Sequence, residues 1–252
     1  MNTIESPGRM LETLSWTEAA SWLSPERIVV LPLGAQSKEH GPHLPLGTDA
    51  HLARWLLRRI LFVRPVLATP LIGFHHYPAF VDYPGSISLR AATAAALVTD
   101  ICVSLARHGP WRFYVINTGI STRRPIERAA ENLRARGLVL RYFDLDALDP
   151  LVEKIAEQAG GSHADEVETS MMLSIRPDVV RMDKAVEDYH PEGRGPFRRE
   201  KSGGGIYSPS GVFGNPTMAT PAKGVVLMKE WVKLLLRDID ALQALERQSL
   251  DQ

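Results

Sequence analysis

Short apolar runs of strand length alternate along this chain with longer segments whose apolar residues recur every three or four positions. The apolar runs that we expect to form strands are residues 27–33, 66–72, 112–116 and 139–143. The segments with helical spacing are residues 15–23, 50–62, 91–108 and 125–136. This alternation predicts right-handed crossovers and an α/β fold of three layers, in which helices cover both faces of a mainly parallel sheet.

The remaining segments give weaker patterns. Residues 73–86 are aromatic and rich in proline, which predicts a loop, and residues 86–89 could form a short strand. Residues 162–173 begin with Ser162, a favourable helix cap, followed by acidic residues that suit the first turn of a helix ending at Pro177. Residues 189–221 contain many Gly, Pro and Ser and predict a long loop, and residues 223–245 predict a final amphipathic helix.

Composition excludes several classes of function. The 252 residues carry 29 basic and 29 acidic side chains, so no overall charge attracts nucleic acid or an anionic membrane. The single cysteine rules out an internal disulfide and indicates a reducing compartment. The sequence contains no run of the roughly 18 apolar residues that a membrane span needs. We expect one soluble, cytoplasmic domain over residues 1–252, acting on a small molecule.

The candidate chemistry is concentrated directly after the first predicted strand, where α/β sheets bind their ligands. Imidazole, carboxylate and ammonium groups are found there within fourteen positions: Lys38, Glu39, His40, His43, Asp49 and His51. Histidine and carboxylate side chains gathered in this way favour a divalent metal site. The plainer interpretation is a loop fixed by a hydrogen bond between His40 and Asp49.

Three stretches in this order carry a resemblance to a known family. Residues 31–49 contain LPLG, EHGPHLP and TD, residues 83–89 read YPGSISL, and residues 163–180 contain HA, VETSMML and RPDVV. Together they resemble the creatininase family of metal-dependent amidohydrolases, over about residues 12–240.

The resemblance implies a creatininase-like three-layer α/β domain, a homohexamer, and two divalent ions bridged by one aspartate. Asp49 matches that bridging aspartate and His40 matches a histidine ligand. His163 and Glu168 match the histidine and glutamate near the substrate, where the histidine serves in proton transfer. Without the resemblance, His163 could equally cap its helix and Glu168 could be a buried anchor.

Two departures from the family pattern affect the metal site. Lys38 stands where the family has its first metal glutamate, and we expect a one-residue longer loop to bring Glu39 into that role. The family's N-G-H-G-G-N turn reads Asn117 to Thr122 here and lacks its histidine. His43, His75 or His76 could replace it, although His43 also suits a positioning role and the other two a pocket wall. Otherwise the site holds one ion or none.

We therefore predict a metal-dependent hydrolase of a small cyclic amide. The predicted metal ligands are Glu39, His40 and Asp49, holding one or two ions of zinc or manganese. The predicted catalytic residues are His163, Glu168 and Lys38, although Lys38 could be a solvated cation, an oxyanion donor or a partner for a substrate carboxylate. Two alternatives are a ring-opening hydrolase of a lactone, keto-sugar or cyclitol, and a catalytically silent relative that binds a ligand or serves in assembly.

Overall fold

The computed structural model describes residues 6–189, 195–201 and 204–246. At its centre lies a sheet of five parallel strands in the order β1-β3-β2-β4-β5. The strands are β1 (Arg9–Met10), β2 (Ile28–Leu33), β3 (Leu67–Ala68), β4 (Arg112–Asn117) and β5 (Val139–Tyr142). This confirms the predicted parallel sheet, and places β2 and β4 side by side at its centre.

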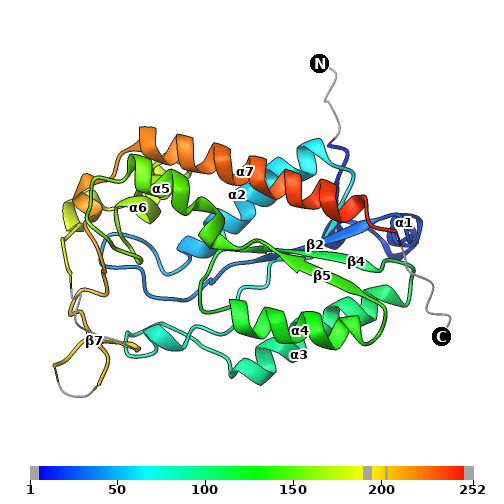
Figure 1. Ribbon diagram of the computed structural model, residues 1–252, viewed down its shortest axis with the longest axis horizontal. Helices are drawn as coiled ribbons and strands as arrows, with labels where there is room; N and C mark the ends of the chain where they lie inside the picture. The colour runs from blue at the N-terminus through cyan, green and yellow to red at the C-terminus, as the bar shows by residue number, and fades with distance from the viewer. Residues whose placement is uncertain (1–5, 190–194, 202–203, 247–252) are drawn as a thin grey trace.

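Helices cover both faces of the sheet, as predicted (Figure 1). One layer consists of α2 (Thr48–Val63), α5 (Asp149–Ile155), α6 (Glu166–Ile175) and α7 (Pro221–Gln243). The other consists of α3 (Ala91–Ala106) and α4 (Arg123–Arg134). A shorter helix, α1 (Trp16–Trp22), connects β1 to β2 and begins with a capping box between Ser15 and Glu18. Within the described residues, no helix is long and apolar enough to cross a membrane.

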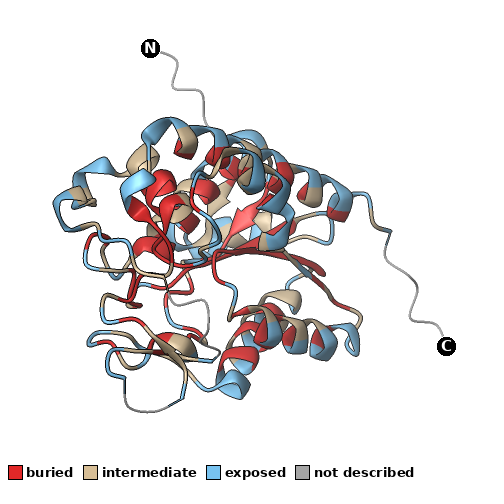
Figure 2. Ribbon diagram, turned by 60° about the vertical axis from the view of Figure 1, so that its left-hand side comes forward, coloured by how far each residue is buried: buried red, intermediate tan, exposed pale blue. Residues whose placement is uncertain are grey.

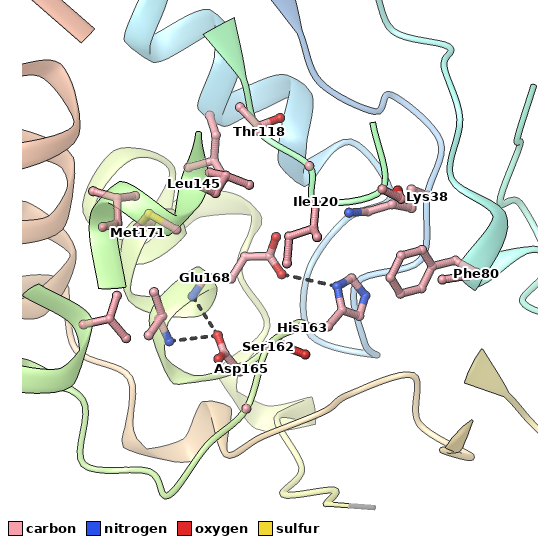
Figure 3. A pocket seen from close by; sticks show the side chains of 18 of the residues that line it. Lys38, Phe80, Thr118, Ile120, Leu145, Ser162, His163, Asp165, Glu168 and Met171 are labelled. Carbon is pink, nitrogen blue, oxygen red and sulfur yellow. Dashed lines mark hydrogen bonds and ion pairs between the residues drawn. The ribbon is translucent and has the colours of Figure 1, made fainter. Parts of the chain in front are cut away.

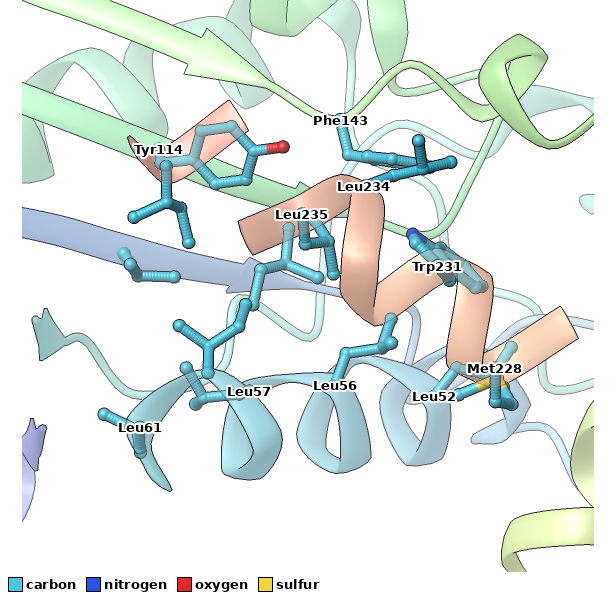
Figure 4. Packing of buried hydrophobic residues seen from close by; sticks show 14 of the residues in the cluster. Leu52, Leu56, Leu57, Leu61, Tyr114, Phe143, Met228, Trp231, Leu234 and Leu235 are labelled. Atoms are coloured by element: carbon cyan, nitrogen blue, oxygen red, sulfur yellow. The ribbon is translucent and has the colours of Figure 1, made fainter. Parts of the chain in front are cut away.

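The period-two pattern of the central strands divides the core into two clusters. Along β2, Val29 and Leu31 pack with α3 and α4, whereas Val30 packs with α2 and α7. Buried residues accordingly follow the sheet and the inward faces of the helices (Figure 2). In the cluster that contains Val30, Trp231 of α7 lies beside Leu52 and Leu56 of α2 (Figure 4). This packing fixes the orientation of α2, whose first turn carries Asp49.

Four details of the prediction were wrong. β3 covers only two residues, because Pro70 has no N–H for a sheet ladder, and a single bridge joins Leu33 to Ile72. Residues 86–89 form no strand, since Ile87 N and Leu89 N donate to loop carbonyls of two different segments. The cap of α6 is Asp165 rather than Ser162. The helix α5 was not predicted.

The long segment 189–221 is a loop in large part, as predicted. It also contains two short parallel strands, β6 (Phe197–Arg198) and β7 (Ile206–Tyr207). Residues 190–194 and 202–203 of this predicted loop lie outside the described residues. Gly211 of this segment lies against the Glu39 side chain, so the segment reaches the loop that follows β2.

Candidate active site and metal centre

The loop after β2 is held in place by close backbone packing and by the YPGSISL motif. A Cβ atom on Gly34 would lie 2.3 Å from the carbonyl oxygen of Asp49, so glycine is needed for α2 to begin this close to β2. Glu39 N donates to Ser86 Oγ at 2.9 Å, and Ile87 N donates to the carbonyl oxygen of Ser37 at 2.9 Å. The motif therefore serves as a frame that fixes the reactive loop.

Asp49 and His40 meet at the bottom of the site, and both side chains are fully buried. His40 Nε2 lies 3.2 Å from Asp49 Oδ1. His40 Nδ1 donates to the carbonyl oxygen of Lys38 at 2.8 Å, and because a carbonyl only accepts, this bond places the proton on Nδ1. In the neutral ring the Nε2 lone pair then faces the Asp49 carboxylate.

Glu168 of α6 completes this arrangement. Its Oε1 atom lies 3.6 Å from His40 Nε2, so two carboxylates face one imidazole nitrogen. Among the described residues, His40, Asp49 and Glu168 form the one group of three or more histidine, cysteine or carboxylate side chains whose ligand atoms all lie within 4.8 Å of one another. Three acceptors that converge in this way need a cation or a proton between them, so the donor set fits a single divalent ion.

Lys38 occupies the other side of Asp49. Its Nζ lies 2.8 Å from Asp49 Oδ2, and its side chain is only 6% exposed, which excludes the solvated cation among its predicted roles. Burial alone would lower the pKa of Lys38, but Asp49 and Glu168 raise it, so the side chain is an ammonium at neutral pH. Burial alone would raise the pKa of Asp49, and the adjacent Lys38 and His40 hold it well below its ordinary value.

Glu39 points toward His163 and does not belong to the group that could hold an ion. His163 Nε2 lies 2.9 Å from Glu39 Oε2, and its Nδ1 lies 3.7 Å from Glu168 Oε2. Burial alone would lower the pKa of His163, but these two carboxylates raise it. Gly211 lies against the Glu39 carboxylate, where a Cβ atom would be 2.1 Å from Oε1. The structure thus brings Glu39 to the candidate proton carrier His163, and the metal-ligand role of Glu39 stays a prediction.

The backbone beside His163 is held in an uncommon conformation. Ala164 has a φ of 49°, and among the described residues it is the one non-glycine residue with a positive φ. Its N–H donates to Glu168 Oε2 at 2.7 Å, which stabilises this conformation. Glu168 therefore both positions the segment that carries His163 and contributes an oxygen to the His40 group.

A cavity of about 420 Å³ opens above these side chains (Figure 3). Lys38, His163 and Glu168 reach its wall, and so do Phe80 and Phe197. The centroid of the Phe80 ring lies 4.1 Å from the centroid of the His163 ring. The same Phe80 centroid lies 5.0 Å from Lys38 Nζ. Most of the remaining wall is apolar: Leu52, Ala79, Ile120, Leu145, Leu148, Val152, Val167, Met171 and Trp231. Phe80 and Phe197 were not singled out from the sequence, because aromatic residues in loops have no periodic signal.

The other predicted replacement ligands lie elsewhere. His43 Nε2 bonds with Thr169 Oγ1 at 2.8 Å, and burial lowers its pKa to about 4. His75 is buried, and burial also lowers its pKa to about 4, while His76 Nδ1 donates to the carbonyl oxygen of Leu89. Within the described residues, none of these three histidines belongs to the group that could hold an ion, and none of them lines the cavity.

In the turn after β4, residues 117–122, the side chains of Asn117, Ser121 and Thr122 already have hydrogen-bond partners. Asn117 Oδ1 accepts from Gly119 N at 3.2 Å and from Thr122 Oγ1 at 2.5 Å. Ser121 Oγ donates to the carbonyl oxygen of His76 at 3.0 Å. The turn lines the cavity beside Lys38, but its polar atoms are engaged in holding the chain.

Comparison with known proteins identifies the family. The family model of creatininase, described as creatinine amidohydrolase, matches residues 12–239. The chain belongs to the creatininase family. It is a divergent member, and the resemblance read from its three motifs is thereby confirmed.

Creatininase relatives with different reactions match nearly the whole chain. Creatinine amidohydrolase of Pseudomonas putida is 28% identical, over 84% of this chain and 84% of the relative. Mycofactocin precursor peptide peptidase of Mycolicibacterium smegmatis is 28% identical, over 81% of each chain. The 3-dehydro-scyllo-inosose hydrolase of Thermotoga maritima is 24% identical, over 92% of this chain and 84% of the relative. The chain is therefore a creatininase-family hydrolase, whose relatives cleave chemically different substrates.

Solved creatininase structures share the fold. A tryptophan-to-phenylalanine mutant of creatininase matches with a TM-score of 0.76 and 23% identity, covering 96% of this chain and all of the other. A structure described as creatininase Mn gives a TM-score of 0.74 at 22% identity, over 94% of this chain. A glutamate-to-glutamine mutant described as the Zn-Zn type gives 0.74 at 22% identity, over 96% of this chain. These matches confirm the creatininase-like α/β fold.

Proposed function

We propose that this creatininase-family hydrolase cleaves the C–N bond of a small cyclic amide at a centre that binds divalent metal. The observation that carries the proposal is the placement of two carboxylates, Asp49 and Glu168, around the Nε2 atom of His40 beneath a cavity reached by His163. Zinc and manganese are the ions we expect, since two related creatininase structures are of the Zn-Zn type and the Mn type. When bound, such an ion supplies Lewis acidity toward a carbonyl and lowers the pKa of water to about 7.

The chain's own residues account for proton movement and substrate position. His163 lies between Glu39 and Glu168, which hold its ring with one nitrogen toward each carboxylate. In ring opening, the hydroxyl group of water adds to the carbonyl carbon, the C–N bond breaks, and the proton that the water gives up passes through His163 to the departing nitrogen. Lys38 reaches the same cavity and can donate a hydrogen bond to the carbonyl oxygen.

The cavity favours an amide with an apolar body. Aliphatic and aromatic residues make up more than half of its wall, and Lys38 and His163 lie on one side of it, beside Phe80. A cyclitol would bring several hydroxyl groups against apolar side chains, which costs free energy for each hydroxyl left without a partner. The relative that hydrolyses 3-dehydro-scyllo-inosose nevertheless makes ring opening of a keto-cyclitol the second candidate.

A substrate panel tests the proposal. The protein is stripped with a chelator, reloaded with Zn²⁺ or Mn²⁺, and assayed against creatinine, lactams, cyclic ureides, lactones and keto-cyclitols. We expect turnover of cyclic amides that disappears on chelation and returns with metal. Amide turnover that survives complete metal removal would refute the proposal, turnover of keto-cyclitols alone would favour the second candidate, and no turnover of any substrate would favour a silent relative.

We also propose a homo-oligomer, the hexamer that the family resemblance implies. Large apolar side chains remain on the surface of the single chain, with Trp16 82% exposed and Ile120 67% exposed. Light scattering after gel filtration measures the mass of the assembly, and a monomer at micromolar concentration would refute this part of the proposal.

A further inference from the structure

The two carboxylate oxygens of Asp49 face two different partners. Oδ1 lies 3.2 Å from His40 Nε2, whereas Oδ2 lies 2.8 Å from Lys38 Nζ. We propose that the Lys38 ammonium is a built-in second positive charge of this centre, so that the site takes a single divalent ion on the side of His40 and Glu168. The inference rests on the proposed function in that the centre binds metal.

The charges of the buried side chains support one ion rather than two. Glu39, Asp49 and Glu168 carry three negative charges, and their side chains are at most 15% exposed. Lys38 together with one divalent ion supplies three positive charges, which matches them, and His163, whose two ring nitrogens face Glu39 and Glu168, adds one more when it carries both protons. A second divalent ion would leave two or three excess positive charges away from water, where uncompensated charge is strongly unfavourable.

The surroundings of Asp49 Oδ2 also offer no second set of ligands. An ammonium group has three donors and no acceptor, so Lys38 cannot coordinate a cation. In the nearby turn Gly119 has no side chain, and the Asn117 and Thr122 side chains bond to each other. Within the parts of the chain that the structure describes, no second group of histidine, cysteine or carboxylate side chains gathers beside this oxygen.

Lys38 is also held in place from the cavity side. Its Nζ atom lies 5.0 Å from the centroid of the Phe80 ring and 5.9 Å from that of Tyr77, distances at which an aromatic face attracts a cation. The ammonium thus lies between the Asp49 carboxylate and two aromatic rings. These contacts hold the ammonium group in one position, unlike that of an exposed lysine.

Counting ions tests the inference without any activity assay. The stripped protein is loaded with Zn²⁺ or Mn²⁺, desalted and measured by elemental analysis, and the same titration is followed by calorimetry. We expect one tightly bound ion per chain for the wild type. In Lys38→Met the count stays at one and the dissociation constant falls by about tenfold or more, because the repulsion between two neighbouring cations is removed. Lys229→Met, at an exposed lysine of α7, is the matched control and leaves both values unchanged.

A constructive variant tests the same idea in the opposite direction. Gly119 accepts a Cβ atom without a clash, since the nearest neighbour would lie 3.5 Å from it. The double variant Lys38→Glu with Gly119→His adds a carboxylate and an imidazole on the Oδ2 side, and we expect it to bind two ions per chain. Gly119→His alone keeps the ammonium and should still bind one, which separates the effect of charge from the effect of an added ligand.

The outcomes distinguish this inference from the proposed function. Two tightly bound ions in the wild type, or an unchanged affinity in Lys38→Met, would overturn the inference and leave the metal-dependent function standing. A folded wild type that binds no ion would overturn both. The wild-type count and the Lys38→Met titration decide the question even when the double variant does not fold, and circular dichroism reports whether it does.

Discussion

Replacing Asp49 by asparagine should destabilise the metal-free protein strongly, because the substitution removes the anion that holds Lys38 in a buried position. At the observed 2.8 Å, the attraction between the two charges is about 6 kcal/mol with an effective dielectric constant of about 20. Desolvation offsets part of this attraction. Breaking a buried ion pair from one side costs roughly 3 to 5 kcal/mol, since the remaining charge is left without compensation.

The assay is urea unfolding of the chelated protein, followed by tryptophan fluorescence, in a double-mutant cycle. We expect Asp49→Asn to lower the free energy of unfolding by roughly 3 to 5 kcal/mol. Adding Lys38→Met should restore a large part of this loss, because the unpaired ammonium is then absent. A loss below about 1 kcal/mol in Asp49→Asn, or additivity of the two substitutions within about 0.5 kcal/mol, would refute the reasoning.

Three further predictions follow from the same site and its surroundings. His163→Gln should lower kcat about 10² to 10⁴-fold and leave the metal content unchanged, whereas equal loss of bound metal would contradict a proton-transfer role. Because the pKa of His75 is lowered to about 4 in the fold, the unfolded chain takes up a proton first as the pH falls through about 6.5. The protein should therefore lose roughly 2 kcal/mol of stability between pH 7 and pH 5 through this residue, and in pH-dependent denaturation the total loss in His75→Leu should be smaller by that amount. Gly211→Ala should lower the free energy of unfolding by about 1 to 3 kcal/mol, because the added Cβ atom collides with the Glu39 carboxylate. The control Gly160→Ala measures the backbone effect alone, since Gly160 has a φ of 81° and nothing near its Cβ position. Equal losses of stability in the two variants would exclude the collision with Glu39.

The sequence predicted the fold best where pattern and packing agree. The apolar run of β2 and the helical spacing of α2 predicted both elements to within about two residues. The motif residues His40, Asp49, His163 and Glu168 do meet in space. Helix α5 escaped prediction because, unlike the equally short α1, it has no capping box: its N-cap residue is Leu148, whose side chain makes no cap hydrogen bond.

At the site, the sequence indicated the right loop but not the directions in which its side chains point. Glu39 and His40 are neighbours in the chain, but successive side chains of a non-helical segment point different ways, so Glu39 reaches His163 while His40 reaches Asp49. Nor does the position of Lys38 in a polar loop reveal its burial. That burial depends on Phe80 and on Asp49, which reach it from separate segments of the chain.

The most direct test of the central claim is the metal content of two glutamate variants measured beside the wild type. After stripping and reloading with Zn²⁺, we predict about one ion per chain in the wild type and in Glu39→Gln, and a loss of at least about tenfold in affinity in Glu168→Gln. Full retention of the ion in Glu168→Gln, with its loss in Glu39→Gln, would contradict the assignment of His40, Asp49 and Glu168 as the centre that holds the cation.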